Sequence, residues 1–414
     1  MAIEDLADWI AQQSAPSRIW FVKRLSANDT QNTGGHQAGP YIPKDLLFRA
    51  LPSLNKPDAE NPRITFDAFI DSHVGHAHQP VTAIWYNNKL RGGTRNEARI
   101  TNWGGSSSPL LDPDSTGALA VFSFFADGRT ESEGLRIWIC DHAIEEELFE
   151  DRMGVPIQPG ESVIWQPTGP QQPGLFAVSR VAVASCRLKP SDMPPAWLTR
   201  FPTGREIVDK SIELRPASSA TIDELLIKRR DCEFEIFLSI EEAIELDRVK
   251  KGYDSIGEFI GHAQSIVQRR KSRAGNSLEF QTHALLREDG FIEGQNFSHK
   301  AESEAGKIPD FLFPSGAAYK DGQFPAERLR LLAAKTTARD RWRQVIDEAD
   351  RIPIKHLLTL QEGVSVKQFA QMEAVGLRLV VPAPLMNAYP EEIRGKLISL
   401  ETFIGEVRNL AIVQ

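Results

Sequence analysis

Short apolar runs separated by turn residues fill the first half of the chain, between residues 18 and 185. The runs are RIWFVKRL (18–25), VTAIWYNN (81–88), LAVFSFF (119–125), GLRIWIC (134–140) and SVIWQP (162–167). Glycine, asparagine and proline separate them at short intervals, as is typical of strands joined by turns and loops. The pattern predicts an all-β barrel or sandwich with long loops.

The pattern changes after a proline-rich segment, LKPSDMPPAW (188–197). Residues 221–252 predict a long helix with Thr221 as its N-cap, and residues 255–270 and 276–289 predict two more helices. The remaining elements alternate: strands at 309–313, 329–335, 356–361 and 377–382, and helices at 339–350 and 366–374. This alternation predicts an α/β second half.

The length of 414 residues favours two domains. We place an all-β domain at residues 1–180, a linker at 181–197 and an α/β domain at 198–414. We find no internal repeat.

Composition points to a soluble globular protein, with 41% apolar and 25% charged residues. Cys140, Cys186 and Cys232 lie far apart without a CxxC pair, which suits a reducing cytosol better than a disulfide framework or a structural zinc site. The first residues, MAIEDLADWIAQQ, carry acids where a signal peptide carries positive charge. No apolar run approaches the length of a membrane span. We therefore expect a cytoplasmic protein.

The net charge of −8 argues against a nucleic-acid partner, but the basic residues are clustered. Residues 269–273 read RRKSR and residues 339–343 read RDRWR. A local basic face can bind nucleic acid whatever the total charge.

Asp310 opens one predicted strand and Lys335 closes another. If the two strands are neighbours, the carboxylate and the ammonium meet at one sheet edge. Such a pair can hold a divalent metal ion and steady an attacking water, as phosphodiester hydrolysis requires. The usual nuclease pattern, PD…(D/E)xK, has an acid two residues before the lysine, where this chain has Ala333.

The missing acid must come from elsewhere, and two residues are candidates. Glu348 lies at the edge of the apolar stripe of the predicted helix 339–350 (Trp342, Val345, Ile346, Ala349). Glu279 lies on a helix just after the RRKSR cluster. The alternatives are a solvated Glu348 and a chance PD…K pairing.

The triplet Arg339-Asp340-Arg341 also has two interpretations. Arginine forms bidentate hydrogen bonds to guanine and a carboxylate accepts from cytosine, so the triplet could read G·C pairs. The alternatives are surface salt bridges, which contribute little, and a capping box between Thr337 and Asp340.

The chain resembles the EcoRII-type restriction endonucleases, Mg²⁺-dependent enzymes that recognise CCWGG in DNA. The resemblance covers KRLSANDT (23–30), TGGHQAG (33–39), YIP (41–43), TRNEARITNWG (94–104), SPLLDP (108–113), TGAL (116–119), RRKSRAGNSLE (269–279), PDFLFPS (309–315), KTTARDRWRQ (335–344), EAD (348–350), LTLQEGVS (358–365) and LRLVVP (377–382).

The resemblance implies an N-terminal B3-like pseudo-barrel that binds an effector copy of the site. It also implies a C-terminal restriction-endonuclease-like α/β domain, of the PD-(D/E)xK type, that dimerises and cuts. Family members need a second site for efficient cleavage, and their N-terminal domain blocks the catalytic cleft until DNA is bound. A cognate DNA methyltransferase is the implied functional partner.

The resemblance also implies roles for individual residues. The catalytic positions are Asp310, Lys335, Glu348 and the nearby Glu279, with Asp310 and Glu348 as metal ligands. The residues implied to recognise DNA bases are Arg339, Asp340 and Arg341. The residues that clamp effector DNA are His36, Tyr41, Arg95, Glu97 and Arg99.

Two positions depart from the family's type member, because Gly93 and Ala98 stand where basic residues are expected. We expect weaker phosphate contacts from this difference. The three histidines of HVGHAH (73–78) are interpreted as a surface loop rather than a metal site.

A site-specific DNA endonuclease is the leading hypothesis. The alternatives are a DNA-binding regulator that does not cut and a structure-specific repair nuclease on the same fold.

Overall fold

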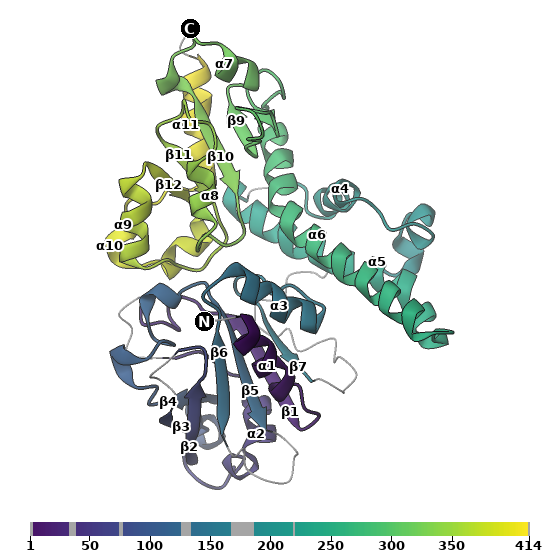
Figure 1. Ribbon diagram of the computed structural model, residues 1–414, viewed down its shortest axis with the longest axis vertical. Coiled ribbons are helices and arrows are strands. Elements are labelled where there is room, and N and C mark those ends of the chain that lie inside the picture. The colour runs from purple at the N-terminus through teal and green to yellow at the C-terminus, as the bar shows by residue number, and fades with distance from the viewer. Residues whose placement is uncertain are drawn as a thin grey trace.

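The computed structural model of the chain describes residues 3–32, 39–73, 78–125, 134–166, 186–217 and 220–412. The N-terminal part (residues 3–166) and the C-terminal part (residues 186–412) each contain one sheet. Figure 1 shows the N-terminal part below, the C-terminal sheet above, and two long helices that project sideways between them.

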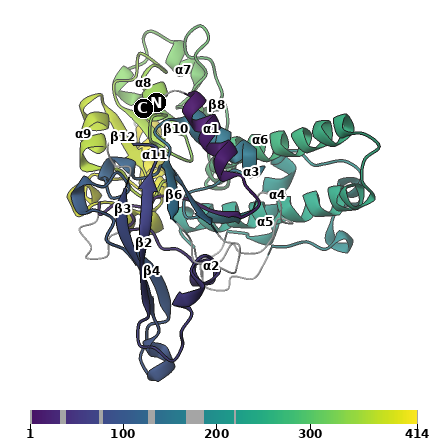
Figure 2. The ribbon, with the colours of Figure 1, turned by 60° about the horizontal axis from the view of Figure 1, so that its bottom comes forward.

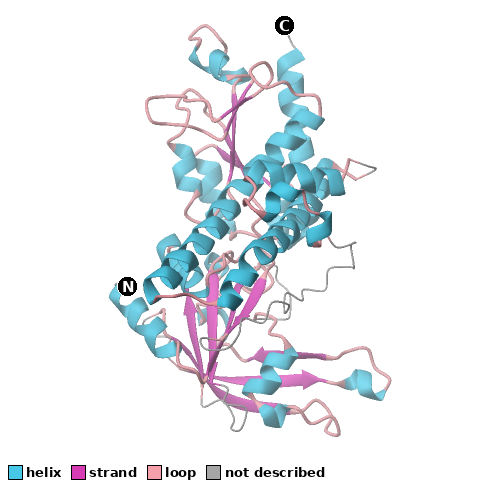
Figure 3. Ribbon diagram, turned by 90° about the vertical axis from the view of Figure 1, so that its right-hand side faces the viewer, coloured by secondary structure: helices cyan, strands magenta, loops and turns pink. Residues whose placement is uncertain are grey.

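The N-terminal sheet has seven strands in the order β4-β3-β2-β6-β5-β1-β7. The strands are β1 (Arg18–Arg24), β2 (Arg63–Ile70), β3 (Gln79–Tyr86), β4 (Glu97–Thr101), β5 (Leu119–Phe125), β6 (Leu135–Ile139) and β7 (Ser162–Trp165). Neighbours are antiparallel except β2 and β6, which are parallel. The sheet is curled, and Figure 3 shows its strands running in two directions.

All five strands predicted for this half are confirmed, but the sequence analysis did not predict β2 and β4. Three helices were also missed: α1 (Ile3–Gln13), α2 (Lys44–Ala50) and α3 (Ala143–Met153). The strand β4 is short and directs only Ala98 and Ile100 inward, so its sequence EARIT looks polar.

Both faces of the central strands are buried. In β1, Phe21 faces a core shared with α2, whereas Trp20 faces a second core that contains Trp9 of α1 and Phe149 of α3. Burial on both faces explains the nearly continuous apolar runs that predicted these strands.

The C-terminal sheet has five strands in the order β12-β11-β10-β9-β8. They are β8 (Ser298–His299), β9 (Phe311–Phe313), β10 (Arg330–Ala334), β11 (Lys355–Leu358) and β12 (Leu377–Val380). The strands β10, β11 and β12 are parallel, and β9 runs antiparallel to β10. In β10, Leu331 and Ala333 face one core and Leu332 and Ala334 face another.

Eight helices accompany this sheet in the described part of the chain. They are α4 (Gly204–Leu214), α5 (Ile222–Lys251), α6 (Ile256–Glu288), α7 (Gly316–Lys320), α8 (Trp342–Ile346), α9 (Val366–Ala374), α10 (Glu391–Arg394) and α11 (Leu400–Ile412). The N-cap at Thr221 is confirmed, since its hydroxyl accepts from the Glu224 N–H at 3.3 Å. Among the described residues, no helix is long and apolar enough to cross a membrane.

The two helices predicted at 255–270 and 276–289 are one continuous helix, α6. No proline interrupts the segment between them. Arg270 and Arg273 pair with Glu241 and Glu233 of α5. These ion pairs stabilise the helix around residues 271–275, where the sequence predicted a break.

The same contacts correct the expectation of a basic face at RRKSR. Arg269 pairs with Glu245 at 2.7 Å, and the guanidinium of Arg270 also donates to the Gly154 carbonyl at 2.6 Å. Arg269 and Arg270 are therefore partly buried and paired with acids of α5, so they do not form a free basic face.

The predicted helix 339–350 is reduced to the five residues of α8. The N-cap position is Arg341 and carries no side-chain cap, so the capping box of Thr337 and Asp340 is wrong. The chain turns at Ala349, whose φ of 53° is incompatible with a helix. The apolar stripe is nevertheless buried at Trp342, Val345 and Ala349.

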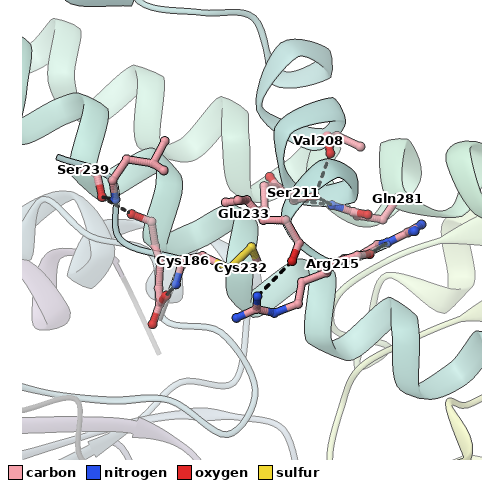
Figure 4. Close-up of a disulfide and its surroundings, with 12 residues drawn as sticks. Cys186, Val208, Ser211, Arg215, Cys232, Glu233, Ser239 and Gln281 are labelled. Carbon is pink, nitrogen blue, oxygen red and sulfur yellow. Dashed lines mark hydrogen bonds between the residues drawn. A yellow bond between two sulfur atoms is a disulfide. The ribbon is translucent and has the colours of Figure 1, made fainter. Parts of the chain in front are cut away.

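The cysteine pattern was interpreted as favouring a reducing cytosol over a disulfide framework, and this is wrong for two of the three cysteines, because Cys186 forms a disulfide with Cys232 of α5 (Figure 4). Their Cα atoms lie 5.1 Å apart although 46 residues separate them in sequence. The remaining thiol, Cys140, is buried. The pairing depends on how residues 186–198 fold back on α5, with Met193 and Trp197 in the same core.

Candidate active site

Asp310 and Lys335 meet where β9 begins and β10 ends. Because the two strands are antiparallel neighbours, the residue before one lies beside the residues that end the other. The Asp310 carboxylate accepts from the Ala334 N–H at 2.8 Å and from the Lys335 ammonium at 3.1 Å, both at Oδ2. One buried oxygen therefore fixes both strand ends and the lysine.

Glu348 lies two residues beyond the end of α8 and interacts electrostatically with both Asp310 and Lys335. Burial, the largest effect, raises the pKa of its carboxyl to about 7; the Asp310 charge raises it further and the Lys335 charge opposes the shift. Its Oε2 atom is buried and has no hydrogen-bond partner among the described residues. An acceptor in this state lacks the compensation that buried carboxylates normally have.

The donor set fits a hard divalent cation. Asp310 and Glu348 supply carboxylate oxygens, which are the ligands that Mg²⁺ and Ca²⁺ prefer. A cation beside Glu348 would give its buried oxygen the partner that it lacks.

Glu279 of α6 lies close by but has partners of its own. Although its burial raises the pKa, hydrogen bonds from His299 and Lys300 outweigh this effect and lower the pKa of its carboxyl. Lys300 also donates its backbone N–H to the Asp310 carbonyl at 3.0 Å. Glu279 is therefore linked to the Asp310 strand through Lys300 and differs from Glu348 in being fully engaged.

The triplet 339–341 lies against the N-terminal part. The Arg339 guanidinium donates to the Cys140 carbonyl at 2.6 Å, to Glu146 at 3.0 Å and to the Asp141 carbonyl at 3.2 Å. Burial raises the pKa of the Glu146 carboxyl, but Arg24 and Arg339 together lower it. Asp340 is exposed and Arg341 is half-buried.

Gln361 holds the backbone of this triplet in place. Its buried side-chain oxygen accepts from the Ala338 N–H at 2.9 Å and the Arg339 N–H at 3.3 Å. Its amide nitrogen donates to the Gly363 carbonyl at 2.7 Å and to the Thr116 carbonyl at 3.4 Å. Gln361 therefore connects the triplet to both parts of the chain.

Further contacts close the same interface. Asp114 accepts from Ser365 and, at 2.7 Å, from Lys367, and its carbonyl accepts from Gln368 at 3.2 Å. The Ala27 N–H donates to the Glu362 carbonyl at 2.9 Å.

The predicted effector residues gather around β4, at the edge of the N-terminal sheet. Glu97 pairs with Arg95 at 2.9 Å and with Arg99 at 3.2 Å, and these two arginines lower the pKa of its carboxyl against the effect of burial. Tyr41 forms an isolated bridge with Arg99. His36 lies outside the described residues.

The two departures from the family differ in their surroundings. Ala98 is completely buried in the core, at the centre of the short strand β4, and the weaker phosphate contacts expected from it stay a prediction. A Cβ added at Gly93 would come within 2.8 Å of the Asn88 side chain.

The described histidines of HVGHAH have separate partners, which agrees with a surface loop. His78 pairs with Asp67 at 2.7 Å and His73 lies 3.7 Å from Asp141. His76 lies outside the described residues.

Sequence reasoning missed His299, Lys300, Gln361 and Glu146. The two-residue strand β8 that carries His299 is too short to give a periodic signal. Glu146 and Gln361 act across the interface between the two parts, which no local pattern reports.

Comparisons with known proteins match the N-terminal and C-terminal parts of the chain to two separate family models. Residues 14–169 match the family model "Restriction endonuclease EcoRII, N-terminal", and residues 237–404 match "EcoRII C terminal". The chain is 41% identical over 404 residues to the type II restriction enzyme EcoRII of Escherichia coli, which covers 97% of each chain.

Two further similarities are more limited. The type II restriction enzyme SsoII of Shigella sonnei is 29% identical over 167 residues, covering 34% of this chain and 53% of that protein. The solved structure of metal-depleted Ecl18kI in complex with uncleaved, modified DNA gives a TM-score of 0.43 at 20% identity. It covers 54% of this chain and 85% of that one.

The substitution Glu348→Gln is expected to stabilise the metal-free protein at pH 8. The pKa of the folded carboxyl is about 7 against a usual 4.5, so the penalty for ionising it develops as pH rises through this range. Allowing for partial screening, we expect a gain of roughly 1–3 kcal/mol at pH 8 and little change at pH 5.

Denaturant unfolding at the two pH values measures this effect, with Glu327→Gln on the exposed surface as the matched control. Equal changes at pH 5 and pH 8 would contradict the electrostatic environment described for Glu348.

Proposed function

The chain belongs to the EcoRII family of type II restriction endonucleases, and from this we propose that it cuts both strands of DNA at CCWGG in a Mg²⁺-dependent reaction. It is a site-specific DNA endonuclease and its substrate is double-stranded DNA. Family membership disfavours the two alternatives, a regulator that does not cut and a structure-specific repair nuclease.

The observation that carries the proposal is the convergence of Asp310, Lys335 and Glu348. Asp310 and Glu348 would hold Mg²⁺, which when bound neutralises phosphate charge and activates water. Lys335, oriented by Asp310 at 3.1 Å, would direct its remaining N–H groups toward the scissile phosphate and the attacking water. Glu279 would act nearby, holding Lys300 and His299 in place.

Asp310→Asn is expected to abolish cleavage and to preserve DNA binding. The change removes one proposed ligand and also the carboxylate that orients Lys335. The loss should exceed the roughly 10–100-fold that removal of an outer-shell partner typically costs. Mapping of cut ends on plasmid DNA containing CCWGG, with binding measured in Ca²⁺, tests this.

Asp209→Asn on the exposed face of α4 is the matched control. Cleavage at a wild-type rate by Asp310→Asn would contradict the catalytic role proposed for Asp310.

Base reading is proposed for Arg339, Asp340 and Arg341. Asp340 and Arg341 come directly before α8 and carry the donor and acceptor groups that suit G·C pairs. Arg339 has the same chemistry, but its guanidinium is engaged by Glu146 and two carbonyls.

Arg341→Ala is expected to relax discrimination at one base pair by about 1–3 kcal/mol, because a bidentate contact to guanine would be lost. Cleavage rates on CCWGG and on single-base variants of that site measure the change. A uniform loss on all sequences would instead assign Arg341 to a phosphate contact.

Effector binding is proposed for the surface around β4, where Tyr41, Arg95, Glu97 and Arg99 gather, together with His36. The edge position of β4 supports this, because Figure 2 shows the β2–β4 strands extending away from the rest of the molecule. We propose a B3-like role for this curled sheet.

We propose that the N-terminal part restrains cutting until effector DNA is bound. The contacts of Arg339 support this, because Glu146 and two carbonyls already occupy donors that a bidentate contact with a base would use. The Asp114 contacts to Ser365 and Lys367 would stabilise the same closed arrangement.

Asp114→Asn is expected to raise the cleavage rate of DNA carrying a single site by roughly 5-fold or more, a typical coupling between sites. The change weakens the interface and leaves the proposed catalytic residues intact. The ratio of one-site to two-site cleavage rates is the measurement, and Asp58→Asn is an exposed control. An unchanged ratio would show that this interface does not restrain cutting.

A homodimer formed by the C-terminal part is also proposed. The described residues form one such centre per chain, so a cut in each strand of a two-fold symmetric site calls for two copies. Exposed apolar side chains near the end of the α5–α6 hairpin support this: Leu246, Val249, Ile256, Phe259 and Ile260.

The division at residues 1–180, 181–197 and 198–414 stays a proposal. Separate cores in the two parts support two domains, and the packing of Met193 and Trp197 on α5 favours a boundary nearer residue 185. A cognate DNA methyltransferase that protects host sites is part of the proposed function.

A further inference from the structure

Three side chains with metal-binding groups converge where α6 ends beside β8. His283 lies in the last turns of α6, Glu293 in the loop that follows, and His299 on β8. Their potential ligand atoms all lie within 4.8 Å of one another. The His283 Nε2 and Glu293 Oε2 atoms are already 3.0 Å apart, and the two imidazole rings have centroids 5.0 Å apart.

We propose that His283, Glu293 and His299 bind a divalent transition-metal ion of the Zn²⁺ class, at a site distinct from Asp310 and Glu348. Two imidazoles and one carboxylate form a borderline-soft, nitrogen-rich set that suits Zn²⁺ and disfavours Mg²⁺. Asp310 and Glu348 offer oxygen ligands only, which gives the opposite preference.

The separation of the groups is compatible with one small ion. Zinc bonds of about 2.0–2.2 Å place neighbouring ligand atoms roughly 3–3.5 Å apart in a tetrahedral site. The His283–Glu293 pair already has this spacing, so only His299 needs to approach by a small side-chain movement. Three protein ligands would leave a fourth position for water.

The hydrogen bonds around the cluster are those expected of the surroundings of a metal site. His299 donates from Nε2 to Glu279, and a carboxylate behind an imidazole orients the ring and raises its basicity as a ligand. Lys300 also contacts Glu279, at 3.0 Å, so this carboxylate is held from two sides.

His283 is buried at the centre of the cluster, beside charged groups. Burial lowers the pKa of its imidazole, with Glu293 opposing the shift and His299 and Arg205 adding to it. A neutral imidazole offers the lone pair that a metal requires. Arg205 interacts electrostatically with His283 and Glu293, and Lys300 pairs with Glu279 behind His299.

Metal at this site would close a loop from α6 to the edge of the C-terminal sheet. The strand β8 has two residues and few ladder hydrogen bonds, so an ion joining His299 to His283 would secure it. Because Glu279 contacts His299 and Lys300, the ion would also fix the position of a carboxylate near the cutting centre.

The test uses the full chain, freed of metal and then titrated with Zn²⁺ or Co²⁺ in excess Mg²⁺. We expect one Zn²⁺ per chain, a raised Tm, and intense visible absorption from Co²⁺ bound to nitrogen in a four-coordinate site. Glu293→Gln and His283→Gln should each weaken binding by at least about 100-fold, because each removes one of three ligands.

Two controls separate this site from the others. His78→Gln alters a histidine–carboxylate pair outside the cluster, and Asp310→Asn disrupts the proposed Mg²⁺ centre; both should bind Zn²⁺ as the wild type does. Circular dichroism checks that each variant is folded, and the partly exposed Glu293 gives the milder substitution.

Two outcomes would overturn the proposal. One is the absence of a tight Zn²⁺ site in the wild-type chain. The other is binding that survives Glu293→Gln and His283→Gln but disappears with Asp310→Asn, which would place the ion at the Mg²⁺ centre.

Discussion

A single carboxylate, that of Asp310, organises the C-terminal sheet edge on which the candidate site depends. It accepts from the Ala334 backbone and the Lys335 ammonium through the same oxygen, so the ends of β9 and β10 are joined by a charged group. Hydrogen bonds to charged groups are stronger than neutral ones. Glu348 Oε2 has no hydrogen-bond partner among the described residues, and burial raises the pKa of this carboxyl to about 7 against the opposing charge of Lys335. The Asp310 carboxylate therefore has hydrogen-bond donors, whereas Glu348 has one buried oxygen without a donor among the described residues.

Hydrogen-bonded charged groups also hold the interface between the N-terminal and C-terminal parts. Arg339 belongs to the triplet proposed to read bases, yet its guanidinium is bound to Glu146 and to carbonyls after β6. Glu146 in turn is shared with Arg24. Competition between DNA and Glu146 for one arginine gives a physical route by which effector binding could be coupled to cutting, without a change in the catalytic residues themselves.

The sequence predicted the elements whose signals are local. The run LLAA became β10 because both of its faces are buried, and Thr221 capped α5 because its side chain bonds its own first turn. The pairing of Asp310 with Lys335 was predicted because one residue begins a strand and the other ends a strand that could lie beside it. Tertiary contacts decided the rest: Arg270 and Arg273 pair with α5 across what looked like a helix break, and Cys186 reaches Cys232 by folding back on α5. The short α8 was missed because the turn at Ala349 depends on packing rather than on a helix-breaking residue type.

The central claim is that Glu348 replaces the acid missing at Ala333 and shares one cation with Asp310. A double-mutant cycle of Mn²⁺ affinity on DNA-bound protein tests it most directly, using Asp310→Asn, Glu348→Gln and the double variant. If both carboxylates face one ion, the account predicts a coupling energy of about 0.5–3 kcal/mol. Strictly additive losses, or unchanged affinity in Glu348→Gln, would contradict it.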